Sequence, residues 1–183
     1  MTADTQESVL VEFREVLNDI GATHEAALWG LNLIRDQMAS NLAAAPNPEA
    51  DLLFGEGPPD NTDTIGRRLW KIGEVQEKLS ADGPVAQRLG QQWAVMVYAQ
   101  WEHSFRPRLA AAAKIELDDV KDDLMGDIRH LRHDILHHSG VATKEHSARC
   151  KVLQWFEPGD PILISSKRVT EFMSLVGLTL KLS

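Results

Sequence analysis

The segment Gly126 to Gly140, GDIRHLRHDILHHSG, has an unusual density of histidine and arginine. Four of the seven histidines in the chain fall between His130 and His138, and Arg129 and Arg132 lie among them. Histidine is the side chain that most readily gives or takes a proton near neutral pH. Arginine offers a fixed fork of donors to phosphate oxygens. The segment is therefore predicted to be the functional centre, and acid–base chemistry on a phosphodiester is one reaction that it suits.

A helical projection at about 100° per residue separates these side chains. The apolar stripe of the predicted helix is formed by Val120, Leu124, Ile128, Leu131 and Ile135. The side chains predicted to point away from that stripe are His130, His133, His137 and Arg129. Arg132 and Asp134 are predicted on the two flanks, and His138 on the core side. Most of the basic residues are thus expected to form a surface.

Three interpretations fit this surface. The first is a solvated helix end, since the helix dipole favours basic side chains in the last turn. The second is a metal site, because His133 and His137 stand four apart and His130 adds a third imidazole. Further ligands, or carboxylates that orient them, would come from Asp127, Asp134 or the pair Glu102-His103. The third is cleavage of RNA through its own 2′-hydroxyl, which needs proton transfer and phosphate binding but no metal.

Composition excludes several other classes of protein. Hydrophobic residues make up 43% of the 183 residues and charged residues 25%, as in an ordinary globular domain. The single cysteine, Cys150, excludes an intramolecular disulfide and a cysteine-rich zinc site, and is expected to be a half-buried filler. The net charge of −8 argues against a broad surface for duplex nucleic acid, but leaves room for a local phosphate site. No apolar run approaches a bilayer span and no signal sequence opens the chain, so a cytoplasmic, unprocessed protein without a membrane partner is expected.

The N-terminal third predicts one long helix followed by a loop. Two interleaved sets of residues, each seven apart, predict a buried seam on a helix over residues 5–42; they are Leu10, Leu17, His24, Leu31 and Met38, and Phe13, Ile20, Ala27 and Ile34. His24 is predicted to be a hydrogen-bonded core histidine. The proline- and glycine-rich stretch Ala45 to Asp63 predicts a loop, and Thr64 to Ser80 a shorter helix.

The rest of the chain predicts three more helices. A row of large apolar residues, four apart, predicts a central helix that begins at Pro84 and is kinked or ended near Pro107; the row is Val85, Leu89, Trp93, Val97, Trp101, Phe105 and Leu109. The next helix is expected to begin near Leu117 and to end at Gly140. Residues 151–156 and 161–164 flank a turn and suit a small hairpin or an extended segment. Ser165 or Ser166 would cap a final helix.

The helix expected between Leu117 and Gly140 contains a motif that resembles the R-x4-6-H motif of HEPN domains, the higher eukaryotes and prokaryotes nucleotide-binding superfamily. This motif is Arg132-His133-Asp134-Ile135-Leu136-His137. The arginine is followed by a polar residue, three further residues and a histidine, late in an amphipathic helix. The stretch Tyr98 to Glu102 resembles the second core helix of bacterial members. Lys151 to Phe156, Gly159-Asp160 and the final helix resemble their C-terminal part. The resemblance covers residues 84–183, with the core motif region at 84–140.

The resemblance implies an all-α fold in a single domain over residues 1–183. This fold is an up-and-down four-helix bundle of HEPN type with a small C-terminal hairpin or extended segment and a final helix. It also implies a homodimer in which two motifs meet across a cleft and form a metal-independent endoribonuclease site without a cofactor. Arg132 would hold the scissile phosphate, and His137 would act as base or acid at the 2′-hydroxyl or the leaving oxygen. His133, His138, Arg129 and Asp134 would support them.

Three details qualify this assignment. His138 also satisfies the motif spacing, but its predicted core-side position favours His137. Arg132 and His137 lie about 140° apart around one helix, so a cleft between two protomers is needed to collect both. Ser139 stands where members paired with a nucleotidyltransferase antitoxin often carry a tyrosine, which argues against that subclass.

The predicted function is therefore an RNA-cleaving toxin or anti-phage effector under the control of an antitoxin or regulatory partner protein. The main alternative is a non-catalytic HEPN module for dimerisation or for sensing a nucleotide or phosphate. A histidine-based metal-binding helical bundle is the third.

Overall fold

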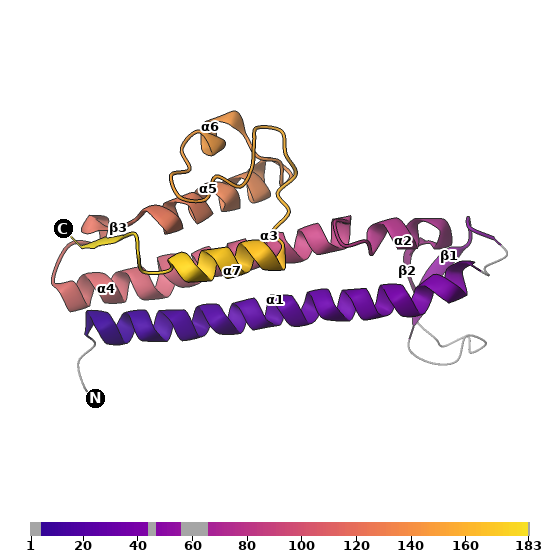
Figure 1. Ribbon diagram of the computed structural model, residues 1–183, viewed down its shortest axis with the longest axis horizontal. Coiled ribbons are helices and arrows are strands. Elements are labelled where there is room, and N and C mark those ends of the chain that lie inside the picture. Colours follow the sequence, from indigo (N-terminus) through magenta and orange to yellow (C-terminus); the bar gives the residue numbers. More distant parts are fainter. Residues whose placement is uncertain (1–4, 44–46, 56–65, 183) are drawn as a thin grey trace. The chain divides into compact units, whose positions relative to one another are not determined.

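The computed structural model describes residues 5–43, 47–55 and 66–182 and is mostly helical (Figure 1). The helices are α1 (Gln6–Ala43), α2 (Val75–Lys78), α3 (Pro84–Gln100), α4 (Arg106–Ala113), α5 (Asp123–His137), α6 (Lys144–Ser147) and α7 (Ser166–Leu175). The strands are β1 (Asp51–Gly55), β2 (Gly66–Lys71), β3 (Val120–Asp122) and β4 (Leu180–Leu182). Within the described residues, no helix is both long enough and apolar enough to span a bilayer.

The chain divides into two compact units, Met1–Ala27 with Gln87–Ser183, and Leu28–Ala86. In the first unit, α1, α3 with α4, α5 and α7 run in alternating directions (Figure 1). Their shared core includes the predicted row on the central helix, with Trp93, Trp101 and Phe105 all buried. The Phe105 ring lies 4.8 Å from that of Phe13, and the Trp93 ring 5.1 Å from that of Phe172. This core fixes the helices against which α5 packs.

The long first helix is confirmed, since α1 covers Gln6–Ala43. Its seam is confirmed at Leu17 and Leu31, which are buried, but is wrong at Ile34, which is 51% exposed. A seven-residue repeat drifts by about 20° per heptad on a straight α-helix, so late members leave the buried stripe. His24 is buried as predicted. The predicted hydrogen bond is not formed in full geometry: neither ring nitrogen has a partner among the described residues, although the carbonyl groups of Leu89 and Ile164 lie close to the ring.

The central helix passes through Pro107 instead of ending there. A π-helical turn, Trp101–Phe105, joins α3 to α4, and Pro107 falls in the first turn of α4. Proline lacks an N–H and its ring crowds the carbonyl group four residues earlier. The wider π-helical turn before the proline is the kind of local adjustment that accommodates this residue within a helix.

The second unit contains a hairpin that the sequence did not predict. Strands β1 and β2 pair antiparallel, with Leu52 opposite Trp70. The predicted loop at 45–63 and helix at 64–80 are therefore wrong over these strands, and only Val75–Lys78 is α-helical. Cross-strand pairs of large apolar side chains stabilise such a ladder. Residues 45–46 and 56–65 of the predicted loop and helix lie outside the described residues.

Helix α5 begins later than expected. The predicted start near Leu117 is occupied by a 3-10 turn and then by β3, which pairs antiparallel with β4. The capping residue is Asp122, whose carboxylate accepts hydrogen bonds from the N–H groups of Leu124 and Met125 at 2.9 and 3.3 Å. The helix ends at His137, and Ser139 and Gly140 both have positive φ, 56° and 72°.

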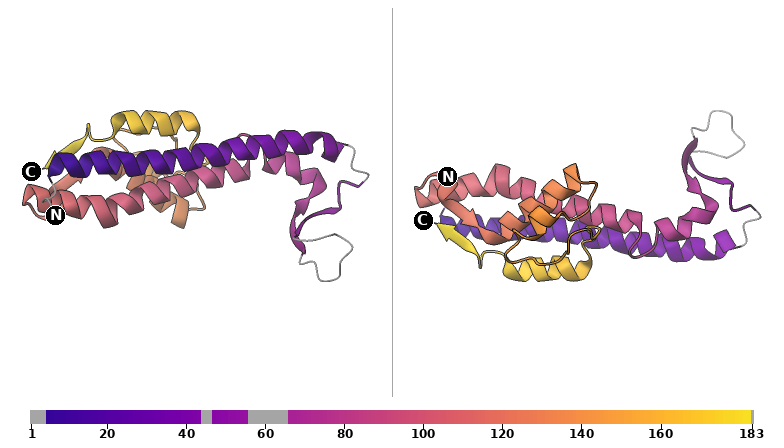
Figure 2. Two further views of the ribbon diagram at one scale, coloured as in Figure 1. Left: turned by 90° about the horizontal axis from the view of Figure 1, so that it is seen from below. Right: turned by 90° about the horizontal axis from the view of Figure 1, so that it is seen from above.

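The chain after α5 forms a long connection that crosses back over the helix. Of the two alternatives predicted for 151–156 and 161–164, the hairpin is absent and the extended segment agrees with the structure, which has here an isolated bridge between Val141 and Pro161. The final helix is confirmed as α7, with Ser165 at its N-cap position. Helix α6, within the connection, lies over α5 on the side away from α1 (Figures 1 and 2).

Two helical glycines give opposite predictions for stability. A Cβ at Gly90 would lie 2.6 Å from the carbonyl oxygen of Ile164, whereas a Cβ at Gly126 would meet no atom within 4 Å. Gly90→Ala is therefore expected to lower the free energy of unfolding by about 2 kcal/mol. Gly126→Ala is expected to raise it by about 0.5 kcal/mol, because alanine loses less backbone entropy in a helix. Urea unfolding measures both, and a stable Gly90→Ala variant would contradict the close packing of α3 on the connection.

Candidate functional site

Helix α5 carries the predicted site residues on its outer face. Leu124, Ile128 and Leu131 point into the core, as the projection predicted. The side chains of Arg129, His133 and His137 are exposed, in agreement with the projection, whereas His130 is half-buried. Helix α6 covers part of this face and brings one further histidine, His146, against it.

These residues surround one pocket of about 490 Å³ between α5 and the α6 segment. It is lined by Arg129, His130, Arg132, His133, His138, Glu145, His146 and Arg149. Three of the eight are arginines and four are histidines, and Glu145 is the only acidic one; it pairs with Arg149 at 2.9 Å. The local charge is therefore positive, although the whole chain is acidic. Such a pocket suits an anion.

A buried carboxylate holds this pocket together. Asp134, predicted on a flank of the helix, is 1% exposed because Thr143 and His146 of the following segment cover it. Its oxygens accept hydrogen bonds from the Thr143 N–H at 2.8 Å, the Thr143 hydroxyl at 3.0 Å and His146 Nδ1 at 2.5 Å. Because a carboxylate only accepts, Nδ1 of His146 is the protonated nitrogen and Nε2 is left for other chemistry. Asp134 thus fixes both α6 and the orientation of His146.

The imidazole rings form a connected cluster around His133. Its ring centroid lies 4.6 Å from those of His137 and His146 and 5.6 Å from that of His138. His130 stacks on His146 at 5.1 Å. His146 was missed by the sequence analysis, because it follows α5 on a separate short helix and no helical projection relates the two. The sequence signal for His146 was Thr143, a residue type that commonly caps the start of a helix, three positions before it.

The cluster lowers the proton affinity of two of its members. Partial desolvation, followed by the charges of His146, His137 and His138, lowers the pKa of His133. Burial and the charge of His146 lower the pKa of His130, although Asp127 opposes this shift. Neutral imidazoles can accept a proton at neutral pH. The pKa of the Cys150 thiol is raised to about 12, mainly by burial, so this half-buried residue is an inert filler as predicted.

The two candidate motif histidines lie in different places from those expected. His138 is exposed and lines the pocket, so its predicted core-side position is wrong. The projection fails there because α5 has already ended, and the backbone of His138 departs from helical geometry at φ −124° and ψ 29°. His137 is exposed outside the pocket lining, with its ring against His133. Arg132 lines the pocket, and its guanidinium carbon lies 5.5 Å from the Tyr98 ring centroid.

A second, more open space of about 540 Å³ adjoins this pocket. Arg129 and Arg132 line both, so they stand on the ridge between them. Tyr98 donates a hydrogen bond to Glu102 at 2.9 Å in this second space, and burial followed by Glu102 raises the pKa of Tyr98. The pair Glu102-His103 lines this space and not the histidine pocket. The prediction that it completes a metal site with the histidines is not supported by this geometry.

The acidic residues near the cluster have structural partners. Asp127 is 1% exposed and accepts N–H bonds from Lys151, Val152 and Leu153, which tie the connection to α5. Potential ligand atoms of His133, Asp134 and His138 do lie within 4.8 Å of one another. Both Asp134 oxygens, however, already accept hydrogen bonds, and three arginines line the same pocket. The donor set is better suited to an anion than to a metal cation.

The buried network of Asp134 leads to a prediction of stability. Burial alone would raise the pKa of Asp134, but hydrogen bonds from Thr143 and His146 outweigh it, and the net pKa is lowered. A lowered pKa in the folded state means that this stabilisation is present above the unfolded-state pKa, about 3.9, and is lost as the pH falls through the folded-state value. Asp134→Asn should lower the unfolding free energy at pH 7 by about 2 kcal/mol and weaken its acid dependence.

Chemical unfolding between pH 7 and pH 3 measures this effect. Asp118→Asn is a suitable control, because the Asp118 side chain is 99% exposed. An Asp134→Asn protein as stable as the wild type at pH 7 would contradict the role of this carboxylate.

No model of a known protein family, no curated protein and no solved structure matches this chain. The likeness of residues 84–183 to HEPN domains therefore stays a prediction from the motif between Arg132 and His137.

Proposed function

We propose that this chain is a metal-independent endoribonuclease of HEPN type that acts as a homodimer. In this proposal the alternating helices of the first unit form the up-and-down bundle of that family, and the end of α5 carries the active site. Arg132 holds the scissile phosphate, and His137 moves the proton at the 2′-hydroxyl or at the leaving oxygen. A partner protein controls the cleavage, as for a toxin or an anti-phage effector.

The observation that carries the proposal is the convergence of arginines and imidazoles on one pocket. Arg129 and Arg132 supply fixed positive charge there, and His133, His138 and His146 supply groups that can exchange protons. His137 lies outside this lining, with its ring 4.6 Å from that of His133, and would reach the phosphate only at the edge shared with a second protomer. Cleavage through a 2′-hydroxyl needs a proton acceptor, a proton donor and positive charge on the phosphate. Side chains at the end of α5 and on α6 offer all three functions.

The reaction is a transesterification in which each proton has a defined route. The 2′-oxygen forms a bond to phosphorus while its proton passes to a neutral imidazole. The bond from phosphorus to the 5′-oxygen breaks while a protonated imidazole gives that oxygen a proton. The products are a 2′,3′-cyclic phosphate and a 5′-hydroxyl. In the proposed dimer two copies of His137 fill these two roles, so the separation of Arg132 and His137 around α5 is no obstacle.

The surface beside His137 supports a second protomer. Leu136 is 51% exposed and Val141 is 39% exposed, and they flank His137 and His138 in the chain. Apolar side chains next to a charged pocket are costly to leave in water. A second copy of the chain that covers them would bring the ends of the two α5 helices together. His137, which does not line the pocket, would then lie close to this interface.

A second candidate is a non-catalytic module that binds a nucleotide or a phosphate at the same pocket. The net charge of −8 favours it, because an acidic chain offers a long RNA little attraction beyond the local arginines. A single phosphate group needs only those arginines.

Substitution of the two motif residues tests catalysis. Arg132→Ala removes the phosphate contact and His137→Gln removes the titratable group, so each is expected to slow cleavage by at least about 100-fold. The assay is cleavage of a structured RNA in excess EDTA. Arg88→Ala, which changes an exposed arginine of α3, is the matched control and should keep wild-type activity.

Full activity in both motif variants would contradict the assignment. Saturable nucleotide binding by a wild-type protein that does not cleave RNA would favour the second candidate. Cleavage that requires added zinc or manganese would favour a metal site instead.

Substitution of an exposed leucine tests the dimer. Leu136→Glu places a charge in the proposed interface, and is expected to yield a monomer in analytical ultracentrifugation and to lose RNA cleavage. Leu178→Glu changes a leucine that is 71% exposed elsewhere and should leave the dimer intact. A monomeric wild-type protein that cleaves RNA would contradict the composite site.

A further inference from the structure

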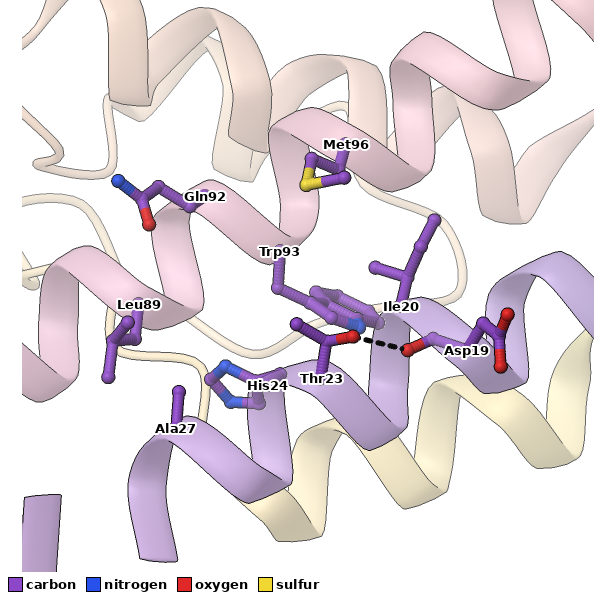
Figure 3. A pocket seen from close by; sticks show the side chains of 9 residues that line it. All are labelled: Asp19, Ile20, Thr23, His24, Ala27, Leu89, Gln92, Trp93 and Met96. Atoms are coloured by element: carbon purple, nitrogen blue, oxygen red, sulfur yellow. Dashed lines mark hydrogen bonds between the residues drawn. The ribbon is translucent and has the colours of Figure 1, made fainter. Parts of the chain in front are cut away.

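Another pocket, of about 370 Å³, lies between α1 and α3 and shares no residue with the histidine pocket (Figure 3). Its wall is mainly apolar and includes Ile20, Ala27, Leu89 and Met96. His24 from α1 and Trp93 from α3 place two aromatic rings at this wall (Figure 3). An apolar space of this size with a few polar groups is typical of sites for small organic molecules.

Both rings carry buried polar atoms that lack partners. His24 is 5% exposed and Trp93 is 2% exposed. Among the described residues, the two ring nitrogens of His24 and the indole nitrogen of Trp93 make no hydrogen bond. The carbonyl groups of Leu89 and Ile164 lie near the imidazole, but not in a geometry that satisfies a ring nitrogen. Since buried polar atoms are nearly always hydrogen-bonded, three such nitrogens at one pocket indicate a ligand that supplies their partners.

The charges around the pocket disfavour an anionic ligand. The described residues that line it include no lysine or arginine, and Asp19 is the acidic one among them, which disfavours an anion. Burial lowers the pKa of His24, although the neighbouring Glu25 opposes the shift. A neutral imidazole offers one donor and one acceptor, and the indole offers one donor. These groups match the edge of a neutral heteroaromatic ring that has both donors and acceptors.

We propose that this pocket binds an uncharged, flat heteroaromatic molecule of about the size of a nucleobase. An acceptor on its edge takes the Trp93 N–H, and a further polar atom pairs with His24. Met96 and the aliphatic wall cover its faces. The nitrogens of His24 and the indole nitrogen of Trp93 are all out of contact with solvent, so binding requires both rings to turn and bring these atoms to the ligand. This inference does not rest on the proposed ribonuclease function.

The full chain allows a direct test by NMR. Its five tryptophans give separate indole N–H signals, and Trp93→Phe identifies the signal of Trp93. Benzimidazole and adenine are the heteroaromatic probes, naphthalene is the apolar control, and benzoate is the anionic control. We expect both heteroaromatic probes to shift the Trp93 signal saturably, with affinities at least about tenfold above those of the controls, because only they can satisfy the buried nitrogens.

Variants of α1 separate the pocket from general surface binding. Ala27→Met fills the pocket and should abolish the shift, whereas Ala26→Met, at an exposed neighbour, should leave it unchanged. His24→Phe keeps a ring but removes its nitrogens, and should weaken benzimidazole at least about tenfold without weakening naphthalene. No saturable shift with either heteroaromatic probe, equal binding of naphthalene, or unchanged binding in Ala27→Met would each overturn the proposal.

Discussion

The carboxylate of Asp134 lies in the interior of the first unit, where an unpaired charge would be very costly. Its partners, Thr143 and His146, come from the connection that follows α5. Two turns earlier, Asp127 holds residues 151–153 in the same way. The hydrogen bonds of two buried carboxylates, together with the burial of Leu153 and Ile162, therefore hold the connection over α5, and this arrangement creates the histidine pocket.

This arrangement explains how an acidic protein can present a site for an anion. The net charge is −8, but three arginines gather at the pocket. The carboxylates of Asp127 and Asp134 on the same helix are buried and accept hydrogen bonds from the connection. Electrostatic attraction falls steeply with distance in salt solution. The pocket can thus attract one phosphate group while the remaining surface repels a polyanion. Such a balance would suit an enzyme whose access to RNA depends on a partner.

Periodic apolar spacing was sufficient to predict the helices with buried faces. The long α1, the row around Trp101 and the stripe on α5 all follow from it. Periodic spacing failed where cross-strand pairing or helix capping determines the local structure. Leu52 opposite Trp70 stabilises a hairpin in a segment without clear periodicity, and Asp122 with β3 delays the start of α5. The clustering of arginine and histidine on α5 was predictable from the sequence, whereas the pocket that they line was not, because His146 reaches it through a tertiary contact.

The chemical ends of the RNA products test the account most directly. A defined oligoribonucleotide incubated with the protein in excess EDTA should yield 2′,3′-cyclic phosphate and 5′-hydroxyl ends by mass spectrometry, and a fully 2′-O-methylated copy should stay intact. This result follows if imidazoles at the end of α5 move the protons and the 2′-hydroxyl attacks. Products with 3′-hydroxyl and 5′-phosphate ends, or cleavage of the methylated copy, would contradict the account.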